Sequence, residues 1–325
     1  MNSKGGIARA LSVLCVAVFC GHPFVAGAQA YPNKPVRVIV AFAAGGFADT
    51  TTRQITQRLS ERLGQHFVVD NRGGAGGNIG AKLAAEANPD GYTLLTHTAA
   101  SSINVTLYKN LGFDLLKDLA PVANTVSVAG LFTVLASHPA NNLRDLIQSS
   151  KGRRVTYATA GVGTSSHIAA DYLLRVLARL DAVHVPFKGG GPAVVAVLGN
   201  QVELLNSSAA AVPHVRAGRM KALAVSSLTR IESMPDVPTV VEAGYPGFEE
   251  RSWVGFFAPA KTPAAVITLL NKEINRALAV PEVASNFKSQ GMDLHPGSPA
   301  DFDRYLQQEV AKWATMVKTS GVKID

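Results

Sequence analysis

Short apolar segments alternate with amphipathic helical segments after residue 30, and this alternation limits the possible folds more than any other feature of the sequence. Strands are predicted at 36–42, 67–69 and 92–96, and helices at 50–63 and 78–87. In the first helix Ile55, Leu59 and Leu63 recur at helical spacing. The β-α-β-α-β order predicts an α/β fold with a parallel sheet and right-handed crossovers.

A second series of elements begins near residue 126. Strands are predicted at 126–136, 155–159, 182–185, 202–205 and 222–225, and helices at 143–149, 168–180 and 192–198. After a strand at 254–257, helices at 263–279 and 299–319 have no third sheet to cover, so we expect them to pack on the first unit. The predicted lobes are residues 31–125 plus 251–325 and residues 126–250. The chain then crosses between them twice, near residues 125 and 250, which predicts a hinge.

The first thirty residues have the layout of a secretory signal peptide. Lys4 and Arg9 precede an apolar run at residues 10–20, and Ala28-Gln29-Ala30 resembles a cleavage site. The run is too short to span a bilayer, and no later run is long enough. We therefore expect a mature chain that starts near Tyr31 and works in the periplasm, away from cytosolic ATP and NAD(P)H.

Cysteine usage gives a second constraint. Cys15 and Cys20 are the only cysteines of the chain, and both lie in the predicted signal peptide. The mature chain would have no disulfide, no cysteine metal site and no cysteine nucleophile. Phe19 stands before Cys20 where a lipoprotein signal has a small residue, which argues against a lipid anchor.

The chain is basic, with 31 Lys+Arg against 23 Asp+Glu. Without Lys4 and Arg9 the balance is 29 against 23, a net charge of +6. Such a charge attracts a small anionic ligand, or it simply keeps the protein soluble. There is no dense basic stretch with interleaved aromatic residues, so nucleic acid is not expected as a partner.

Two loops share one design: a predicted strand, a glycine-containing turn and a helix. The first is residues 43–49 (AAGGFAD) and the second is residues 160–166 (AGVGTSS). Glycine lets the backbone approach a ligand closely, and the start of a helix presents unpaired N–H groups with a partial positive charge. Asp49 is a candidate N-cap, as are Thr164, Ser165 and Ser166. One such turn on each lobe predicts a carboxylate site in the cleft between them.

These loops belong to a longer set of motifs. In order along the chain they are Tyr31-Pro32-x-Lys34-Pro35-Val36-Arg37, Phe42-x-x-Gly45-Gly46-x-x-Asp49, Asn71-Arg72-x-Gly74-Ala75-Gly76-Gly77-Asn78-Ile79-Gly80, Pro89-Asp90-Gly91-Tyr92-Thr93-Leu94, Gly163-Thr164-Ser165-Ser166-His167, Val185-Pro186-Phe187-Lys188-Gly189-Gly190-x-Pro192-Ala193, Ala217-Gly218-Arg219 and Pro235-x-Val237-Pro238-Thr239. In spacing and order the chain resembles the Bug family, the periplasmic solute receptors of tripartite tricarboxylate transporters. The resemblance runs the whole length of the chain.

The resemblance implies a two-lobed periplasmic binding protein fold, type II-like, with two crossings between lobes. It implies a monomer that binds a small organic carboxylate between the lobes and delivers it to the membrane permease subunits of the transporter, with no cofactor and no metal. By position, the resemblance assigns to ligand binding Ala44, Gly45, Gly46, Phe47, Asp49, Thr98, Ser101, Ala160, Gly161, Thr164, Ser165, Ser166, Asn206 and Ser207.

Phe47 is a departure from the family pattern, which often has glycine there and prolines where this chain has Ala43 and Ala44. An aromatic ring at this position would narrow the cleft, which favours a ligand with an apolar or aromatic part over citrate. The alternative is that the ring turns away into its own lobe.

Other motifs have competing interpretations. Residues 74–80 read G-x-G-x-x-x-G, which differs from the dinucleotide fingerprint and is typical of close packing between helix and loop. His167 follows two serines, but there is no G-x-S-x-G elbow and no paired histidines at metal spacing. Lys188 and Arg72 are candidate cations for a carboxylate, and Trp253 is expected to pack at the hinge. We therefore predict a receptor and no enzyme; an exported α/β hydrolase and a sensory binding protein for a signalling partner remain the alternatives.

Overall fold

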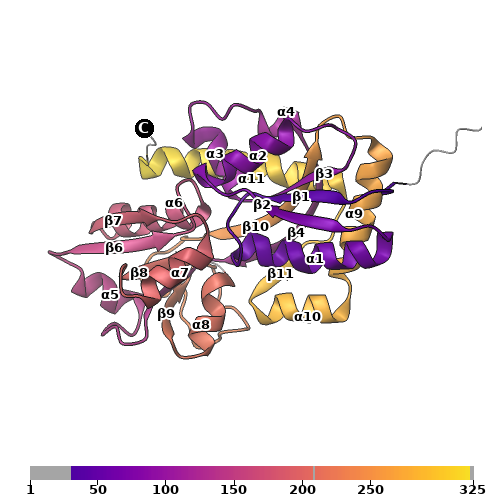
Figure 1. Ribbon diagram of the computed structural model, residues 1–325. Helices are drawn as coiled ribbons and strands as arrows, with labels where there is room; N and C mark the ends of the chain where they lie inside the picture. The colour runs from indigo at the N-terminus through magenta and orange to yellow at the C-terminus, as the bar shows by residue number, and fades with distance from the viewer. Residues whose placement is uncertain (1–30, 208, 323–325) are drawn as a thin grey trace, which may run out of the picture. The chain divides into compact units, whose positions relative to one another are not determined.

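Two separate β-sheets organise the computed structural model, which describes residues 31–207 and 209–322 (Figure 1). The predicted signal peptide, residues 1–30, lies outside the described residues and stays a prediction. All elements below belong to one compact unit that begins at Pro32. We call the part with the six-stranded sheet lobe 1 and the part with the five-stranded sheet lobe 2.

Lobe 1 contains the first three predicted strands, and they are parallel as expected. The spatial order of its sheet is β11 (Met292–Leu294), β4 (Leu119–Ala129), β10 (Arg251–Pro259), β3 (Thr93–Thr98), β1 (Val36–Val40) and β2 (Phe67–Asn71). β1 pairs in parallel with β2 and β3, whereas β10 runs antiparallel to both β3 and β4. The helical elements of lobe 1 are α1 (Phe47–Leu63), η1 (Ala75–Gly77), α2 (Asn78–Ala85), α3 (Ala100–Leu107), α4 (Leu115–Asp118), α9 (Ala264–Leu278), α10 (Pro281–Ser289) and α11 (Pro299–Ser320).

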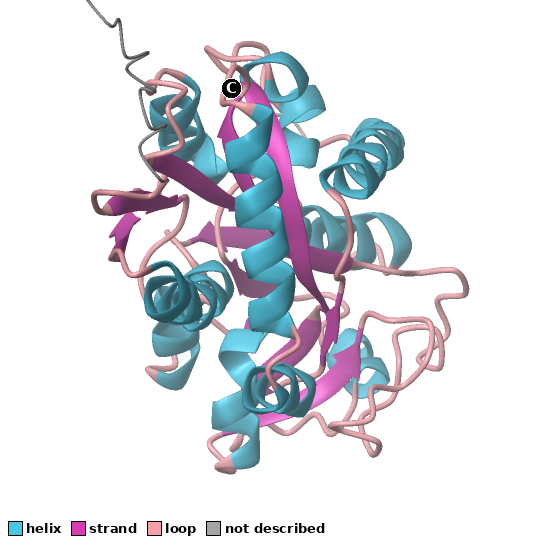
Figure 2. Cartoon of the chain, turned by 90° about the vertical axis from the view of Figure 1, so that its right-hand side faces the viewer, coloured by secondary structure: helices cyan, strands magenta, loops and turns pink. Residues whose placement is uncertain are grey.

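Lobe 2 repeats the α/β design with a mixed sheet. Its spatial order is β7 (Asp181–Pro186), β6 (Arg154–Thr159), β8 (Leu204–Ser207), β5 (Leu131–Leu135) and β9 (Met220–Val225). The helical elements are α5 (Leu143–Ser149), α6 (Ser165–Asp171), the π-helical η2 (Tyr172–Leu177), α7 (Gly190–Leu198), η3 (Ala209–Ala211) and α8 (Val212–Arg216). In the view of Figure 2, helices lie on both sides of the strands, as expected when both faces of a sheet are buried.

The chain changes sheet at Gly130, so the prediction of one strand over 126–136 is wrong. β4 ends at Ala129 in one sheet, and β5 begins at Leu131 in the other. A Cβ atom on Gly130 would overlap the carboxylate of Glu250, so only glycine fits where the backbone passes between these side chains. Because β4 and β5 are both mostly buried, residues 126–136 form one apolar run in the sequence. In the structure this run is divided between the two sheets.

The second crossing lies beside the first. β10 begins at Arg251, which pairs with Ala129 at the end of β4. Ser226, just after β9, donates its N–H to Gly130 O at 2.9 Å and accepts from Glu250 N at 3.0 Å. Backbone hydrogen bonds therefore join both chain crossings, which places them in one narrow region.

The last helices pack on lobe 1, as predicted. Trp253 in β10 is fully buried against Phe302 of α11, with ring centroids 5.6 Å apart. Trp253 and Trp313 both donate their indole N–H to Glu309 Oε2, at 3.0 and 2.9 Å. The predicted position of Trp253, packed near a crossing, is confirmed. None of the described helices combines the length and the apolar character that a bilayer crossing requires.

The structure corrects one predicted helix start and agrees with another. The predicted helix at 50–63 begins earlier, at Phe47, because Gly46 is its N-cap; Asp49 is therefore not the cap. Thr164 is the N-cap of α6, and its hydroxyl accepts from His167 N, as predicted for this position. The prediction also omitted α3, α4, α8, α10 and β11.

Candidate functional site

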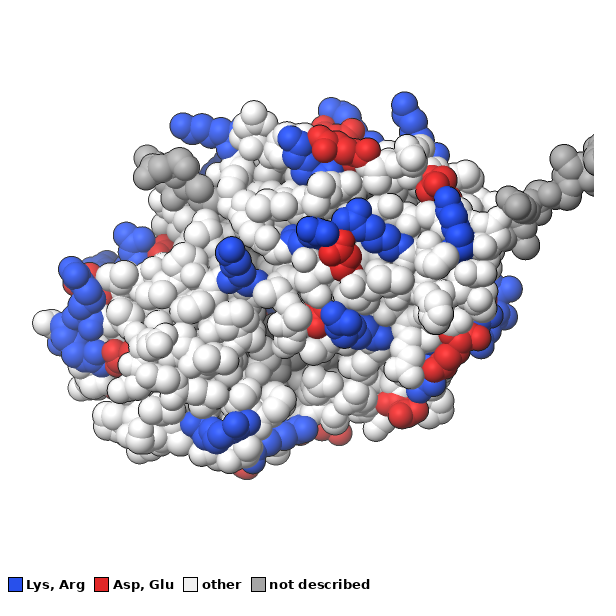
Figure 3. Space-filling model, in the orientation of Figure 1, with Lys and Arg blue, Asp and Glu red and all other residues white. Residues whose placement is uncertain are grey.

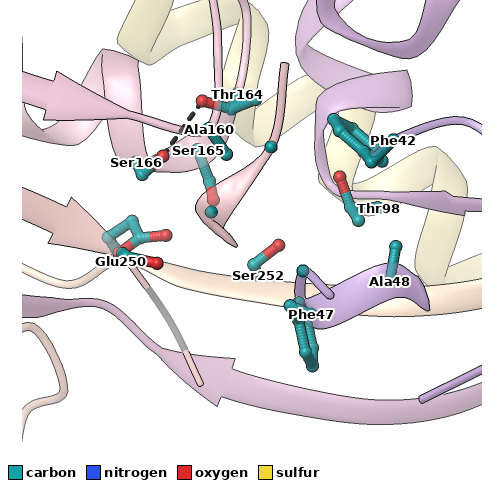
Figure 4. A pocket seen from close by; sticks show the side chains of 14 residues that line it. Phe42, Phe47, Ala48, Thr98, Ala160, Thr164, Ser165, Ser166, Glu250 and Ser252 are labelled. Carbon is teal, nitrogen blue, oxygen red and sulfur yellow. Dashed lines mark hydrogen bonds between the residues drawn. The ribbon is translucent and has the colours of Figure 1, made fainter. Parts of the chain in front are cut away.

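A small buried cavity lies between the two lobes, with a volume of about 40 Å³. Its walls are Phe42, Gly46, Phe47, Ala48, Thr98, Ala160, Thr164, Ser165, Ser166, Gly189, Gly190, Ser207, Glu250 and Ser252. Figure 4 shows these residues arriving from both lobes around a common space. A water molecule needs roughly 10–15 Å³ measured this way, so the space fits a group of a few atoms.

Three helices begin at this cavity. Gly46 is the N-cap of α1, Thr164 that of α6 and Gly189 that of α7, and all three line the wall. The first N–H groups of a helix have no partner within the helix and carry a partial positive charge. No side chain caps α1 or α7, so their first N–H groups remain available. The cavity is therefore surrounded by backbone donors that favour an anion.

Side-chain hydroxyls complete the polar part of the wall. They belong to Thr98, Thr164, Ser165, Ser166, Ser207 and Ser252. No lysine, arginine or histidine is among the lining residues, and Glu250 is the one ionisable side chain among them. Recognition of an anion here must depend on neutral hydrogen-bond donors, because no positive side chain faces it.

The first loop is held in place from both lobes. Ala43 donates its N–H to Lys188 O of lobe 2 at 2.9 Å. A Cβ atom on Gly191 would lie 3.5 Å from Ala44 O, so the backbones of the two loops pass close to each other. The loop before α1 thus meets the loop before α7 directly, which brings two helix N-termini to the same cavity.

Asp49 organises the first loop from within. Its carboxylate accepts from Gly45 N at 2.9 Å, from Asn71 Nδ2 at 2.9 Å and from Arg53 Nε at 3.0 Å. Burial raises the pKa of this carboxyl, but the Arg53, Gly45 and Asn71 hydrogen bonds outweigh it, so the pKa lies below its usual value. An ionised, fully partnered Asp49 fixes the backbone of residues 43–46 at the start of α1.

The second loop rests on two stacked histidines. Thr164 Oγ1 donates to Gly161 O at 2.7 Å, which closes the turn. His167 and His184 stack with ring centroids 3.9 Å apart, and Gly163 N donates to His167 Nδ1 at 3.3 Å. Burial lowers the pKa of His167 to about 4 and that of His184 to about 3. Both rings are therefore neutral at pH 7, and they form an apolar support beneath the loop.

Sequence comparison with known families matches residues 51–322 to the tripartite tricarboxylate transporter family receptor. This chain belongs to that receptor family. Protein BugT of Bordetella pertussis is 35% identical over 306 residues, which cover 91% of this chain and 92% of that protein. The predicted resemblance to the Bug family is confirmed.

Two solved structures resemble this receptor over nearly their whole length. An R. palustris protein solved with adipate has a TM-score of 0.87 at 32% identity, covering 90% of this chain and 99% of that one. MatC from Rhodopseudomonas palustris, solved with bound malate, has a TM-score of 0.84 at 33% identity, covering 88% and 100%. The two-lobed periplasmic binding protein fold predicted from the sequence is confirmed.

Most residues that the sequence assigned to the receptor's site lie in the cavity wall. They are Gly46, Phe47, Thr98, Ala160, Thr164, Ser165, Ser166 and Ser207. Phe47 is 7% exposed, and in Figure 4 its ring points to the side opposite Thr98 and Thr164. The ring thus closes one side of the cavity and does not cross its centre.

The other assigned residues lie outside the wall. Ala44 and Gly45 are exposed parts of the first loop, and Asp49 is enclosed by its three donors. Ser101 donates its hydroxyl to Thr98 O at 3.0 Å. Asn206 donates Nδ2 to Ser166 O at 2.9 Å, which supports the second loop.

Gly161 and Lys188 line a neighbouring cavity of about 300 Å³, which shares only Phe42 and Ala160 with the first. Lys188 therefore does not face the helix N-termini. Arg72 pairs with Asp70 at 2.9 Å, which agrees with the prediction that it fixes its own turn.

The glycine motif at 74–80 serves packing, as predicted. A Cβ atom on Gly80 would lie 2.9 Å from Arg72 O and 3.0 Å from Ala41 Cα, and one on Gly77 would overlap the His97 ring. α2 can approach the end of β1 because these side chains are absent. In the part of the chain that the structure describes, no group of three or more His, Cys, Asp or Glu is placed to hold a metal ion.

Six wall residues of this receptor were absent from the sequence prediction: Phe42, Ala48, Gly189, Gly190, Glu250 and Ser252. Gly189 and Gly190 had a usable signal, since a glycine run followed by Pro192 opens a helix in the same way as the other two loops. Glu250 and Ser252 had none, because they enter the site through the pairing of β10 with distant strands.

Proposed function

We propose that this receptor closes around a small organic carboxylate and delivers it to the membrane permease subunits of a tripartite transporter. The observation that carries the proposal is the convergence of three helix N-termini on one buried cavity without a lysine or arginine in its wall. Carboxylates suit backbone N–H donors and hydroxyls, and such a site is selective for the carboxylate group itself.

The proposed contacts come from the two predicted loops and the loop before α7. Gly46, Phe47 and Ala48 supply N–H groups from α1, and Gly190 supplies one from α7. Thr98, Ser165 and Ser207 add hydroxyl donors. We assign Asp49, Ser101 and Asn206 to support of the site, because each lies outside the cavity wall and is hydrogen-bonded to another protein group.

The cavity size favours a compact acid. At about 40 Å³ it takes a carboxylate group and few further atoms in this closed arrangement. Relatives solved with adipate and malate support aliphatic dicarboxylates as the first candidates. A longer acid would extend between Phe42 and Ala160 into the neighbouring cavity, whose apolar wall includes Tyr108 and Phe187.

Capture requires that the lobes separate, because the wall is buried. We propose that lobe 1, with the six-stranded sheet, and lobe 2, with the five-stranded sheet, rotate about the paired crossings at Gly130 and Glu250. Ligand favours the closed form because only that form brings all three N-termini to it. We further propose that the receptor is an exported monomer that works in the periplasm after removal of residues 1–30.

The alternatives have less support. A hydrolase needs an activated nucleophile, but His167 is buried and stacked on His184, and the cavity wall contains no histidine. On the face shown in Figure 3, lysines and arginines are scattered among acidic residues, without the continuous basic stripe of a nucleic-acid binder. A sensory role would use the same ligand site, and a pull-down against membrane partners distinguishes it from transport.

Thermal-shift screening followed by calorimetry tests the function. The panel is malate, adipate, citrate, benzoate and, as a neutral control, adipamide. We expect at least one acid to raise the melting temperature and adipamide to leave it unchanged, with the ligand recovered intact. Turnover of an acid, or equal binding of adipamide, would overturn the proposal.

A further inference from the structure

Glu250 occupies an unusual position for a site that binds anions. It is 1% exposed and lies in the cavity wall, where an ionised carboxylate would repel the proposed ligand. In Figure 4 its side chain lies on the same side of the cavity as Ser165 and Ser166. Glu250 is at the second chain crossing, so its carboxyl group lies in the cavity wall and next to the proposed hinge.

The hydrogen bonds around Glu250 determine where protons can be. Ser226 Oγ lies 2.7 Å from the Glu250 carbonyl oxygen and 3.1 Å from Glu250 Oε2. The carbonyl oxygen can only accept, so the single hydroxyl proton of Ser226 is used there. The contact with Oε2 is the longer branch of this shared hydrogen bond, so Ser226 gives an ionised Glu250 carboxylate little stabilisation.

A second buried acceptor lies at the same point. Asn206 is fully buried, and its Oδ1 has no hydrogen-bond partner among the described residues. Oδ1 of Asn206 and Oε2 of Glu250 both crowd the position that a Cβ on Gly130 would take. An acceptor without a donor beside a carboxyl group favours the protonated acid, since two acceptors side by side repel.

No lysine or arginine among the described residues forms an ion pair with Glu250. Arg251 of β10 is bound to Asp293, and Lys312 of α11 is bound to Glu309 at 3.1 Å. α6, β8 and the segment after β9 present only the neutral Ser165, Asn206 and Ser226. Burial raises the pKa of Glu250 above its ordinary value, and the Ser165 and Ser226 hydroxyls and the charges of Lys312 and Arg251 offset this only in part.

We propose that Glu250 is a further ligand-binding residue of the receptor, which keeps its proton in the cavity and donates it in a hydrogen bond to the bound carboxylate. The inference rests on the proposed function for the identity of the ligand. An ionised Glu250 would repel the bound carboxylate, whereas a protonated Glu250 can donate a hydrogen bond to it. The bound carboxylate then faces donors from both lobes. An acid that carries an ammonium group would instead favour an ionised Glu250.

The proton state is tested without ligand. Infrared difference spectra of wild type minus Glu250→Gln, recorded for the full chain at pH 7, should contain a protonated carboxyl band. The matched control is Glu249→Gln, the same change at the neighbouring residue, which is not in the cavity wall. Absence of the band for Glu250 overturns the inference even if the receptor binds acids.

The role in binding is tested by calorimetry with malate and adipate. Glu250→Gln retains a donor of the same shape, so its affinity should stay within about threefold of wild type, whereas Glu250→Ala should lose about tenfold or more. Wild-type affinity should fall by up to about tenfold per pH unit once free Glu250 ionises, and Glu250→Gln should not show this fall.

A loss beyond about tenfold in Glu250→Gln at every pH, or affinity of wild type that rises with pH, would overturn the inference and indicate an ionised Glu250. Failure of both acids to bind wild type would count against the proposed function, and the infrared band still decides the proton state. Circular dichroism melting of each variant reports whether it folds.

Discussion

Ala43 of lobe 1 donates its backbone N–H to the carbonyl oxygen of Lys188 in lobe 2, at 2.9 Å. This bond joins the loop before α1 to the loop before α7, and it lies beside the cavity where three helices begin. Because it links two backbone atoms, it depends on the closeness of the loops and not on a side chain. Its presence defines the arrangement described above as a closed form.

Gly46→Val should abolish carboxylate binding with little effect on the fold. A Cβ atom at Gly46 lies 3.5 Å from Gly190 N, so the methyl groups of valine would enter the space between α1 and α7. Calorimetry with malate and adipate measures the loss. Gly297→Val is the control, because its Cβ meets only Asp301 at 3.6 Å, far from the cavity wall. Wild-type affinity in Gly46→Val would remove the first loop from the site.

Gly163→Ala should hold the lobes apart. A Cβ atom there would overlap Oδ1 of Asn104 in lobe 1, and Gly163 has φ +78°. The variant should lose about tenfold or more in affinity and show a larger radius of gyration with ligand by X-ray scattering. Gly152→Ala has the same backbone strain, with φ +79°, but its Cβ meets nothing within 4 Å. If both variants lose affinity equally, contact between the lobes is not the cause.

Asp49→Asn should weaken both binding and folding. The amide keeps one acceptor oxygen but places an NH2 donor against Gly45 N or Asn71 Nδ2, and it removes the charge paired with Arg53, at a cost of roughly 1–3 kcal/mol. Urea unfolding measures the stability, and calorimetry measures the affinity for malate and adipate. Asp236→Asn, at an exposed residue, is the control. Unchanged affinity in Asp49→Asn would show that the first loop keeps its shape without this carboxylate.

Acid should destabilise the receptor through His167 and His184. Their pKa values in the folded chain, about 4 and about 3, lie below the ordinary value of 6.5. The unfolded chain therefore takes up protons first as pH falls below about 6.5, so stability decreases from there until the folded-state pKa values are reached. Between pH 7 and pH 4.5 the loss should be on the order of 2 kcal/mol for each histidine.

Urea unfolding at the two pH values measures this loss. His184→Phe keeps a ring that can stack on His167 and Tyr157, and it should reduce the pH dependence. His66→Phe, at an exposed position, should leave the pH dependence as in wild type. An equal pH dependence in all three proteins would place the acid sensitivity elsewhere.

Much of the fold follows from local patterns. Ile55, Leu59 and Leu63 at helical spacing predicted α1, and the apolar runs predicted β1, β3 and β6, because these patterns report which face of each element is buried. The helix at 299–319 was predicted almost to its ends from its apolar face, and the structure adds a capping box of Ser298 and Asp301 at its start. The prediction missed the break at Gly130, because a buried strand has the same apolar sequence pattern in either sheet.

The sequence by itself determined that this is an α/β receptor in which glycine turns precede helices. Strand periods, helix caps and motif spacing each depend on residues that are close together in the sequence. Only the tertiary structure decided which turns meet. Gly189 and Gly190 join the cavity because their loop touches Ala43 and Ala44, and Glu250 faces it because β4 and β10 pair side by side. These contacts link residues more than a hundred positions apart, and their closeness depends on packing between the lobes and on strand pairing within lobe 1, which no local pattern records.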